Sequence, residues 1–204
     1  MSLPRRIAVT GNIGSGKTTV CRQCERLGLP VYYADERARA LMSEDAELVA
    51  ALRAAFGPAT YRPDGSLDRA YLAGVAFGDP DRLAALNALV HPAVHRDADA
   101  WHRSQLASGA PYTLYEAAIT LEIGAADRFA GVVVVAAPYA LRRVRVLARG
   151  GITAAEFDRR AARQWPDERK EAAADFLVRN DGRRLLLPQV LGLHRWASGS
   201  SGPR

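Results

Sequence analysis

A glycine-rich segment near the N-terminus contains the residue types that hold the phosphates of a nucleotide. It reads Gly11-Asn12-Ile13-Gly14-Ser15-Gly16-Lys17-Thr18 and fits the pattern G-x-x-x-x-G-K-[ST]. Glycines let the backbone curl so that successive N–H groups point at phosphate oxygens, at the positive end of the helix that follows. We therefore predict a phosphate loop in which Lys17 reaches the β- and γ-phosphates and Thr18 coordinates Mg²⁺. The alternative is a glycine-rich turn that matches the pattern by chance.

A carboxylate follows the next predicted strand. Residues 31–34 are apolar or aromatic, and Asp35 comes directly after them. In a doubly wound sheet ligands gather at the carboxyl ends of the strands, so we expect Asp35 to face the transferred phosphoryl group. There an ionised aspartate can accept a hydrogen bond from an attacking hydroxyl and orient it. Asp35 can also be the N-cap of the following helix, and the two roles can coexist.

The elements around these residues alternate between short apolar runs and helical periodicity. This alternation is typical of an α/β fold, in which helices cover the faces of a parallel sheet. Strands are predicted over residues 7–10, 31–34, 112–117, 132–136 and 176–178. Helices are predicted from the phosphate loop to Gly28, after Pro138, and over residues 183–196.

A long helical stretch, residues 36–108, separates the second and third predicted strands. It contains an apolar stripe over residues 48–56, a turn at 63–65, a helical run over 67–77, and a helix from Pro80 to about Val90. No strong strand pattern interrupts it. We interpret this stretch as a helical insertion into the sheet domain.

The sheet domain then comprises residues 1–35 and 109–204, and one part of it has a different composition. Residues 152–174 are highly charged, helical in pattern and poor in large apolar side chains, so we expect them to be exposed and mobile. This composition is typical of a lid, which we place at about residues 149–166. Residues 198–204 are rich in serine and glycine, and we expect a frayed end there.

Composition limits the class of protein. The 204 residues are 49% hydrophobic and 25% charged, which excludes collagen-like, coiled-coil and wholly disordered chains. No apolar run approaches the roughly 18 residues that cross a bilayer, and the N-terminus lacks the pattern of a signal peptide. We therefore expect a cytoplasmic protein with no membrane partner. Cys21 and Cys24 lack a second ligand pair, so small core residues are favoured over a zinc site.

Lysine is rare in this basic chain. The formal net charge is +6, and Lys17 and Lys170 are the two lysines among 28 basic residues, so 26 are arginine. The positive excess favours an anionic partner, although a merely soluble basic surface explains it equally well. The sequence has no basic run with interleaved aromatic residues. We therefore predict no nucleic-acid partner, and a nucleotide-responsive nucleic-acid-binding module is the least favoured alternative.

The chain resembles the dephospho-CoA kinase family in several motifs beyond the phosphate loop. In chain order these are Ala34-Asp35, Leu86-Asn87-Ala88-Leu89-Val90-His91-Pro92, Glu116-Ala117-Ala118-Ile119 through Glu122, Arg160-Ala161-Ala162-Arg163-Gln164-Trp165-Pro166, Lys170, Ala174-Asp175 and Asn180. The resemblance implies a P-loop kinase-like core with a helical insertion that binds the acceptor substrate and a helical lid. It also implies Mg²⁺-dependent transfer of the γ-phosphoryl group of ATP to the ribose 3′-hydroxyl of dephospho-CoA. We expect a monomer or a small homo-oligomer.

The resemblance also implies roles for individual residues. The catalytic positions are Asp35, Lys17 and Arg149. The ATP-binding positions are Gly11, Asn12, Ile13, Gly14, Ser15, Gly16, Lys17, Thr18, Thr19 and Arg145, and Thr18 is the metal ligand. The substrate-binding positions are Asn87, His91, Glu116, Glu122, Arg160 and Gln164. From the residues alone, His91 can equally be a packed or helix-capping histidine, and most of the arginines can form a solvated face.

The sequence departs from the common family pattern in three places. Asn12 stands where the loop usually has a second glycine, which is tolerable if its φ is negative. Tyr33 replaces the first carboxylate of the usual D-A-D, so Asp35 carries more of the work, with Glu116 as a second acidic group near a strand end. Ala118 replaces the proline of the usual P-L-L-x-E.

The nearest alternative is a kinase of the same fold that acts on a nucleoside monophosphate or another small metabolite. Such an enzyme shares the sheet and the phosphate loop, so neither feature discriminates between the two functions. The His91-Pro92 element and the lid pattern favour the dephospho-CoA kinase.

Overall fold

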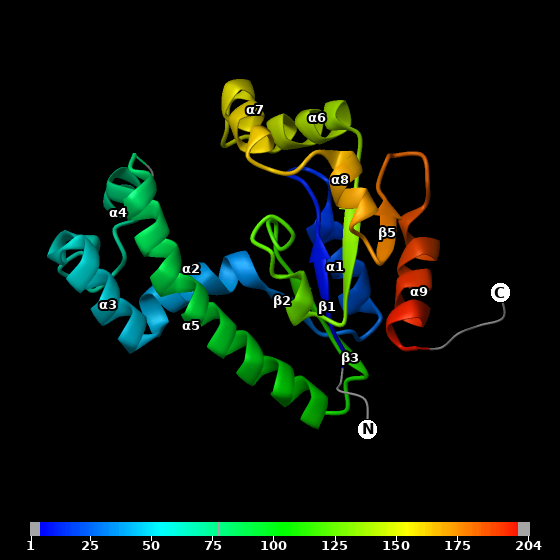
Figure 1. Ribbon diagram of the computed structural model, residues 1–204, viewed down its shortest axis with the longest axis horizontal. Helices are drawn as coiled ribbons and strands as arrows, with labels where there is room; N and C mark the ends of the chain where they lie inside the picture. The colour runs from blue at the N-terminus through cyan, green and yellow to red at the C-terminus, as the bar shows by residue number, and fades with distance from the viewer. Residues whose placement is uncertain (1–4, 77, 200–204) are drawn as a thin grey trace. The chain divides into compact units, whose positions relative to one another are not determined.

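The structure, a computed structural model, describes residues 5–76 and 78–199 (Figure 1). The chain divides into two compact units. One unit consists of Met1–Tyr32 together with Ser104–Arg204, and the other of Tyr33–Arg103. Among the described helices, none is long and apolar enough to span a bilayer.

The first unit is built on a five-stranded sheet in the order β2-β3-β1-β4-β5. Its strands are β1 Arg5–Thr10, β2 Val31–Tyr33, β3 Tyr112–Glu116, β4 Gly131–Ala136 and β5 Phe176–Arg179. Strand β1 pairs in parallel with β3 and β4, and β4 pairs in parallel with β5. The predicted α/β fold with a parallel sheet is therefore confirmed. Because the strand order reverses around β1, a ligand crevice is expected at the carboxyl end of this strand.

The central strands are apolar because helices cover both of their faces. Residues 7–9 of β1 and residues 132–135 of β4 are buried along their whole length. The helices of this unit are α1 Lys17–Arg26, α6 Tyr139–Arg149, α7 Ala154–Ala162, α8 Asp167–Ala172 and α9 Leu186–Ala197, with a 3₁₀ turn η2 at Ala126–Arg128. Helix α1 contacts α9, and α6 contacts α7.

The second unit is helical, as the sequence predicts. It contains α2 Ala34–Glu44, α3 Ala46–Phe56, a 3₁₀ turn η1 at Pro58–Thr60, α4 Arg69–Ala76 and most of α5 Pro80–Ala107. Tyr61 and Leu67 form an antiparallel bridge that closes the predicted turn at residues 63–65. Phe77, the end of one predicted helical run, lies outside the described residues.

The helix that we predicted to end near Val90 is much longer. Helix α5 runs for 28 residues and passes through Pro92. A proline inside a helix removes one backbone hydrogen bond, which packing can compensate. The buried residues of α5 are Val90, Ala93, Val94 and Ala98, so the stripe that packs the helix continues past the proline. Burial of this stripe explains why the helix does not stop where the sequence pattern indicates.

Three further predictions differ from the structure. Strand β2 ends at Tyr33, and Tyr33 itself is the N-cap of α2, so Asp35 lies in the first turn of the helix and is not its cap. The segment 152–174 is not exposed throughout, because Phe157 and Lys170 have 0% and 1% exposed surface. The last helix begins at Leu186, and residues 200–204 of the predicted frayed end lie outside the described chain.

Candidate active site

The phosphate loop connects β1 to α1, at the carboxyl end of the central strand. Gly11, Gly14 and Gly16 have positive φ angles of 151°, 79° and 92°. In the part of the chain that the structure describes, only glycines have a positive φ. Asn12 therefore occupies the position that is usually glycine in the family without backbone strain. The first N–H groups of α1 have no partner within the helix and are available to an anion at this end.

Gly14 is required by its surroundings as well as by its φ angle. A Cβ at this position would lie 2.6 Å from the carbonyl oxygen of Arg142 on α6. We predict that Gly14→Ala lowers the free energy of unfolding by about 1–3 kcal/mol and weakens ATP binding. Chemical denaturation and a nucleotide titration measure the two effects.

Gly28 provides the matched control for this substitution. It has the same φ of 79° but no atom within 4 Å of a Cβ. Gly28→Ala therefore reports the cost of the backbone conformation without a steric clash. If both variants lose the same stability and both bind ATP normally, the close packing of α6 on the loop has no consequence.

Lys17 is the first residue of α1, and its side chain turns back over the loop. Its Nζ donates a hydrogen bond to the carbonyl oxygen of Gly11 at 2.9 Å. Thr18 and Thr19 follow in the first turn of the helix, half-buried and exposed respectively. The loop thus combines an ammonium group, helix N–H groups and two hydroxyls at one strand end.

Two arginines of α6 hold the loop from outside. The guanidinium of Arg142 is 3% exposed and donates to the carbonyl of Ile13 at 3.3 Å and to both carboxylate oxygens of Asp167 at 3.1 and 2.8 Å. Arg145 donates to the carbonyl and the side-chain oxygen of Asn180, at 3.0 and 3.2 Å. Burial, and then the neighbouring charge of Arg149, lower the pKa of Arg145. Arg149 itself is exposed at the end of α6.

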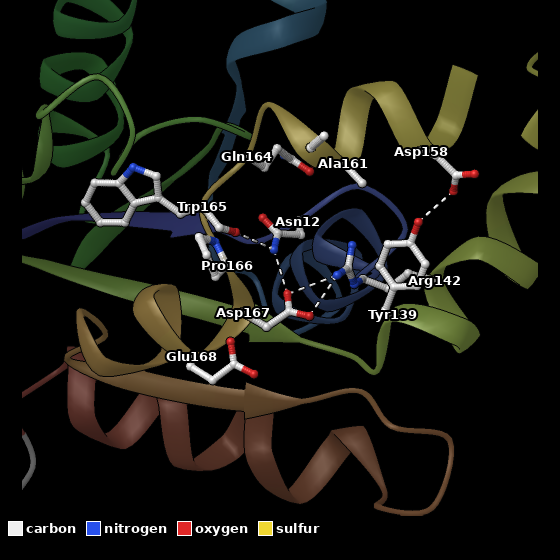
Figure 2. Close-up of a pocket in the computed structure, with 11 residues that line it drawn as sticks. Asn12, Tyr139, Arg142, Asp158, Ala161, Gln164, Trp165, Pro166, Asp167 and Glu168 are labelled. Carbon is white, nitrogen blue, oxygen red and sulfur yellow. Dashed lines mark hydrogen bonds and ion pairs between the residues drawn. The ribbon is translucent and has the colours of Figure 1, made fainter. Parts of the chain in front are cut away.

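The residues after α7 lie against the loop (Figure 2). The side-chain oxygen of Gln164 accepts a hydrogen bond from the N–H of Ile13 at 2.8 Å. The amide of Asn12 donates to the carbonyl of Trp165 and to Asp167. A cavity of about 390 Å³ lies beside these contacts. Arg160, the other predicted residue of this motif, is exposed and pairs with Glu156 one turn earlier in α7.

The acidic residues predicted near β3 occupy different environments. Glu116 is the last residue of β3, 6% exposed, and lies opposite Val9 in the register with β1. Glu122 forms an ion pair with Lys170 at 2.8 Å and accepts the N–H of Trp165 at 3.1 Å. Burial lowers the pKa of Lys170, and the hydrogen bond that its ammonium donates to Glu122 opposes this shift.

We predict that Lys170→Met lowers the free energy of unfolding by about 3–5 kcal/mol, because it leaves the Glu122 carboxylate buried without its partner. Adding Glu122→Gln removes the orphaned charge and should recover part of the loss. Urea denaturation of the two single variants and the double variant measures the coupling. As a control, the more exposed pair of Arg179 with Glu171 at 2.9 Å should contribute less than about 1 kcal/mol. A Lys170→Met variant as stable as the parent contradicts this assignment.

The remaining predicted residues belong to the helical unit. Asp35 is exposed in the first turn of α2. Two residues later, Arg37 binds both carboxylate oxygens of Asp97 on α5, each at 3.1 Å, which fixes α2 against α5. Asn87 and His91 lie one turn apart on α5, so they share a face of that helix. The expected approach of Asp35 to the phosphate loop stays a prediction.

Comparisons with known proteins agree with these features. The family model described as dephospho-CoA kinase matches residues 5–185. The chain belongs to the dephospho-CoA kinase family. Relatives named dephospho-CoA kinase from Chlorobaculum tepidum and Salinibacter ruber are both 39% identical, over 185 and 176 residues, and the matches cover 88% and 86% of this chain and 88% of each relative. The crystal structure of TT1252 from Thermus thermophilus is similar at a TM-score of 0.77 and 35% identity, and the match covers 98% of this chain and 99% of that one.

The sequence did not single out three residues that the structure places at the phosphate loop of this dephospho-CoA kinase family member. In the sequence, Arg142 is one of four arginines on a helix, Asp167 belongs to no motif, and Asn180 is part of a family motif. Each contacts the loop from a position more than 100 residues away in the chain. Helix α6 carries four arginines, and nothing in its sequence indicates that Arg142 is the buried one.

Proposed function

We propose that this protein transfers the γ-phosphoryl group of ATP to the ribose 3′-hydroxyl of dephospho-CoA and releases CoA and ADP. One observation carries the proposal. The chain matches the dephospho-CoA kinase family over residues 5–185. The positive-φ glycines of the loop and the ammonium of Lys17 beside it support the same function.

The phosphates of ATP bind at the loop and the first turn of α1. Backbone N–H groups at this helix end and the ammonium of Lys17 compensate the charge of the β- and γ-phosphates. Arg149 lies exposed one turn after Arg145 and can reach the transferred group when the lid segment 149–166 closes. Closure excludes water and limits wasteful hydrolysis of ATP.

Magnesium is the expected metal, and the donor chemistry of the site fits it. Mg²⁺ prefers oxygen ligands and is usually held by one or two protein groups together with substrate phosphates. The hydroxyl of Thr18 and the carboxylate of Glu116 at the end of β3 are oxygen donors of this kind. When bound, the ion neutralises charge on the β- and γ-phosphates.

Asp35 is the proposed base for the acceptor hydroxyl. Its carboxylate is exposed and lies at the start of α2, where it can accept a hydrogen bond from the ribose 3′-hydroxyl. Asn87 and His91 on α5 are proposed to hold the same substrate. We assign acceptor binding to residues 36–108 and nucleotide binding to residues 1–35 and 109–204.

An acceptor panel tests the function. ADP release is measured with dephospho-CoA, AMP, CMP and adenosine at equal concentrations. We expect dephospho-CoA to give a kcat/KM at least about 100-fold above the others, because a site built around one acceptor discriminates by the contacts that the others lack. Faster ADP release with AMP or CMP would assign the chain to the nucleoside monophosphate kinases instead.

A further inference from the structure

Asn12 lies where β1 enters the phosphate loop, and its side chain is turned away from solvent. It is 6% exposed, and its Nδ2 donates to Asp167 Oδ1 at 2.6 Å and to the carbonyl of Trp165 at 3.1 Å. Both partners are acceptors, so the atom that contacts them must be the amide nitrogen. Both of its N–H groups are therefore committed to the segment that follows α7 (Figure 2).

Asp167 binds Asn12 and Arg142 at once. One nitrogen of the Arg142 guanidinium, Nη2, lies within hydrogen-bond distance of both oxygens of this carboxylate, which makes a charge-assisted contact between the two side chains. The remaining hydrogen bonds of Arg142 go to the carbonyls of Ala137 and Ile13, at 3.0 and 3.3 Å. All three nitrogens of this buried guanidinium donate to protein acceptors, so we assign Arg142 to organising the loop.

These contacts hold both backbone groups of Ile13. Gln164 accepts its N–H at 2.8 Å, and Arg142 donates to its carbonyl. In a trans peptide the carbonyl and the next N–H point in opposite directions. Holding the Ile13 carbonyl towards Arg142 therefore turns the N–H of Gly14 the other way.

The far end of the loop is held in the same manner. Asn180 donates its Nδ2 to the carbonyl of Ser15 at 2.8 Å, and Arg145 fixes Asn180. The N–H of Gly16 is consequently turned away from Asn180. Two carbonyls of the loop are thus tied outward, and the N–H groups of Gly14 and Gly16 are turned inward before any ligand binds.

We propose that Asn12, Arg142 and Asp167 are positioning residues that preset the phosphate loop and fasten it to the end of the lid segment. The proposal rests on the ATP-binding role assigned to the loop under the proposed function. If the contacts of Asn12, Arg142 and Asp167 were absent, the loop backbone would be free before binding and would have to be ordered when ATP binds. Ordering one residue lowers the affinity by about tenfold.

The test measures the Kd of Mg-ATP by calorimetry in the absence of acceptor. Asn12→Ala removes the amide and should raise this Kd about tenfold, while the melting temperature stays within a few degrees and the KM for dephospho-CoA within about twofold. Glu168→Gln, an exposed charge change at the neighbouring residue, is the matched control and should bind ATP like the parent.

A polarity swap separates the proposed contact from a general packing role. Asn12→Asp places two carboxylates 2.6 Å apart in the parent geometry and should raise the Kd further than Asn12→Ala. Adding Asp167→Asn restores a donor and an acceptor across the same gap with the direction reversed, but it also removes the charge that Arg142 binds, so the rescue is partial. We expect the double variant Asn12→Asp/Asp167→Asn to bind ATP at least about fivefold more tightly than Asn12→Asp alone, since one good hydrogen bond is regained.

Two results would overturn the inference. One is an Asn12→Ala variant that binds ATP as tightly as the parent, and the other is a double variant that binds no better than Asn12→Asp. Neither result depends on the acceptor. If the parent protein itself binds no ATP, the proposed function is wrong. Failure of the proposed function can therefore be distinguished from failure of this inference.

Discussion

Replacing Lys17 by alanine is expected to lower the rate of phosphoryl transfer by about 10³-fold or more, which amounts to loss of the activity. Lys17 begins α1, and its ammonium lies over the loop, 2.9 Å from the carbonyl of Gly11. A triphosphate in the loop would meet this cation directly. Without it, the loop loses a positive charge that would compensate the charge of the γ-phosphate.

Steady-state ADP release with dephospho-CoA measures this effect, and thermal unfolding checks that the variant is folded. Lys17→Arg is the matched variant, because it keeps the charge but replaces a compact ammonium by a planar fork. We expect it to retain more activity than Lys17→Ala but to stay well below the parent. If Lys17→Ala releases ADP at the rate of the parent, residues 11–18 are not the phosphate loop.

Replacing Asp35 by asparagine should lower kcat by about 100-fold or more and leave the affinity for ATP nearly unchanged. The substitution keeps the size of the side chain but removes its negative charge, so it loses most of its ability to accept the proton of the ribose hydroxyl. In the proposed function ATP binds through the loop and α1, which belong to the other compact unit of the chain. The loss should therefore appear in the chemical step.

Single-turnover kinetics and an ATP titration separate the two quantities. Glu36→Gln is the control, since Glu36 is the exposed carboxylate next to Asp35 in the first turn of α2 and carries the same charge. We expect its kcat to stay within about twofold of the parent, as for most surface substitutions. If Asp35→Asn shows the same small change, Asp35 is not the base.

Much of the unit that contains the sheet could be predicted from the sequence because its signals are local. The glycine spacing of the loop encodes positive φ angles within six residues, and the structure shows them at Gly11, Gly14 and Gly16. The continuous apolar runs predicted the buried central strands. The end of α5 could not be predicted in this way, because the packing of residues beyond Pro92 overrides a local stop signal.

The sequence by itself determined the phosphate loop, the α/β sheet and the family of this protein, because each depends on residue types at short, fixed spacing. The tertiary structure decided what the arginines of α6 do. In the sequence Arg142, Arg145 and Arg149 are equivalent basic residues on one helix. In the fold Arg142 is buried against Asp167 and Ile13, Arg145 holds Asn180, and Arg149 is exposed. Their environments differ because burial and hydrogen bonding depend on residues that are up to 129 positions away in the chain. These residues meet only when the sheet and its helices pack together.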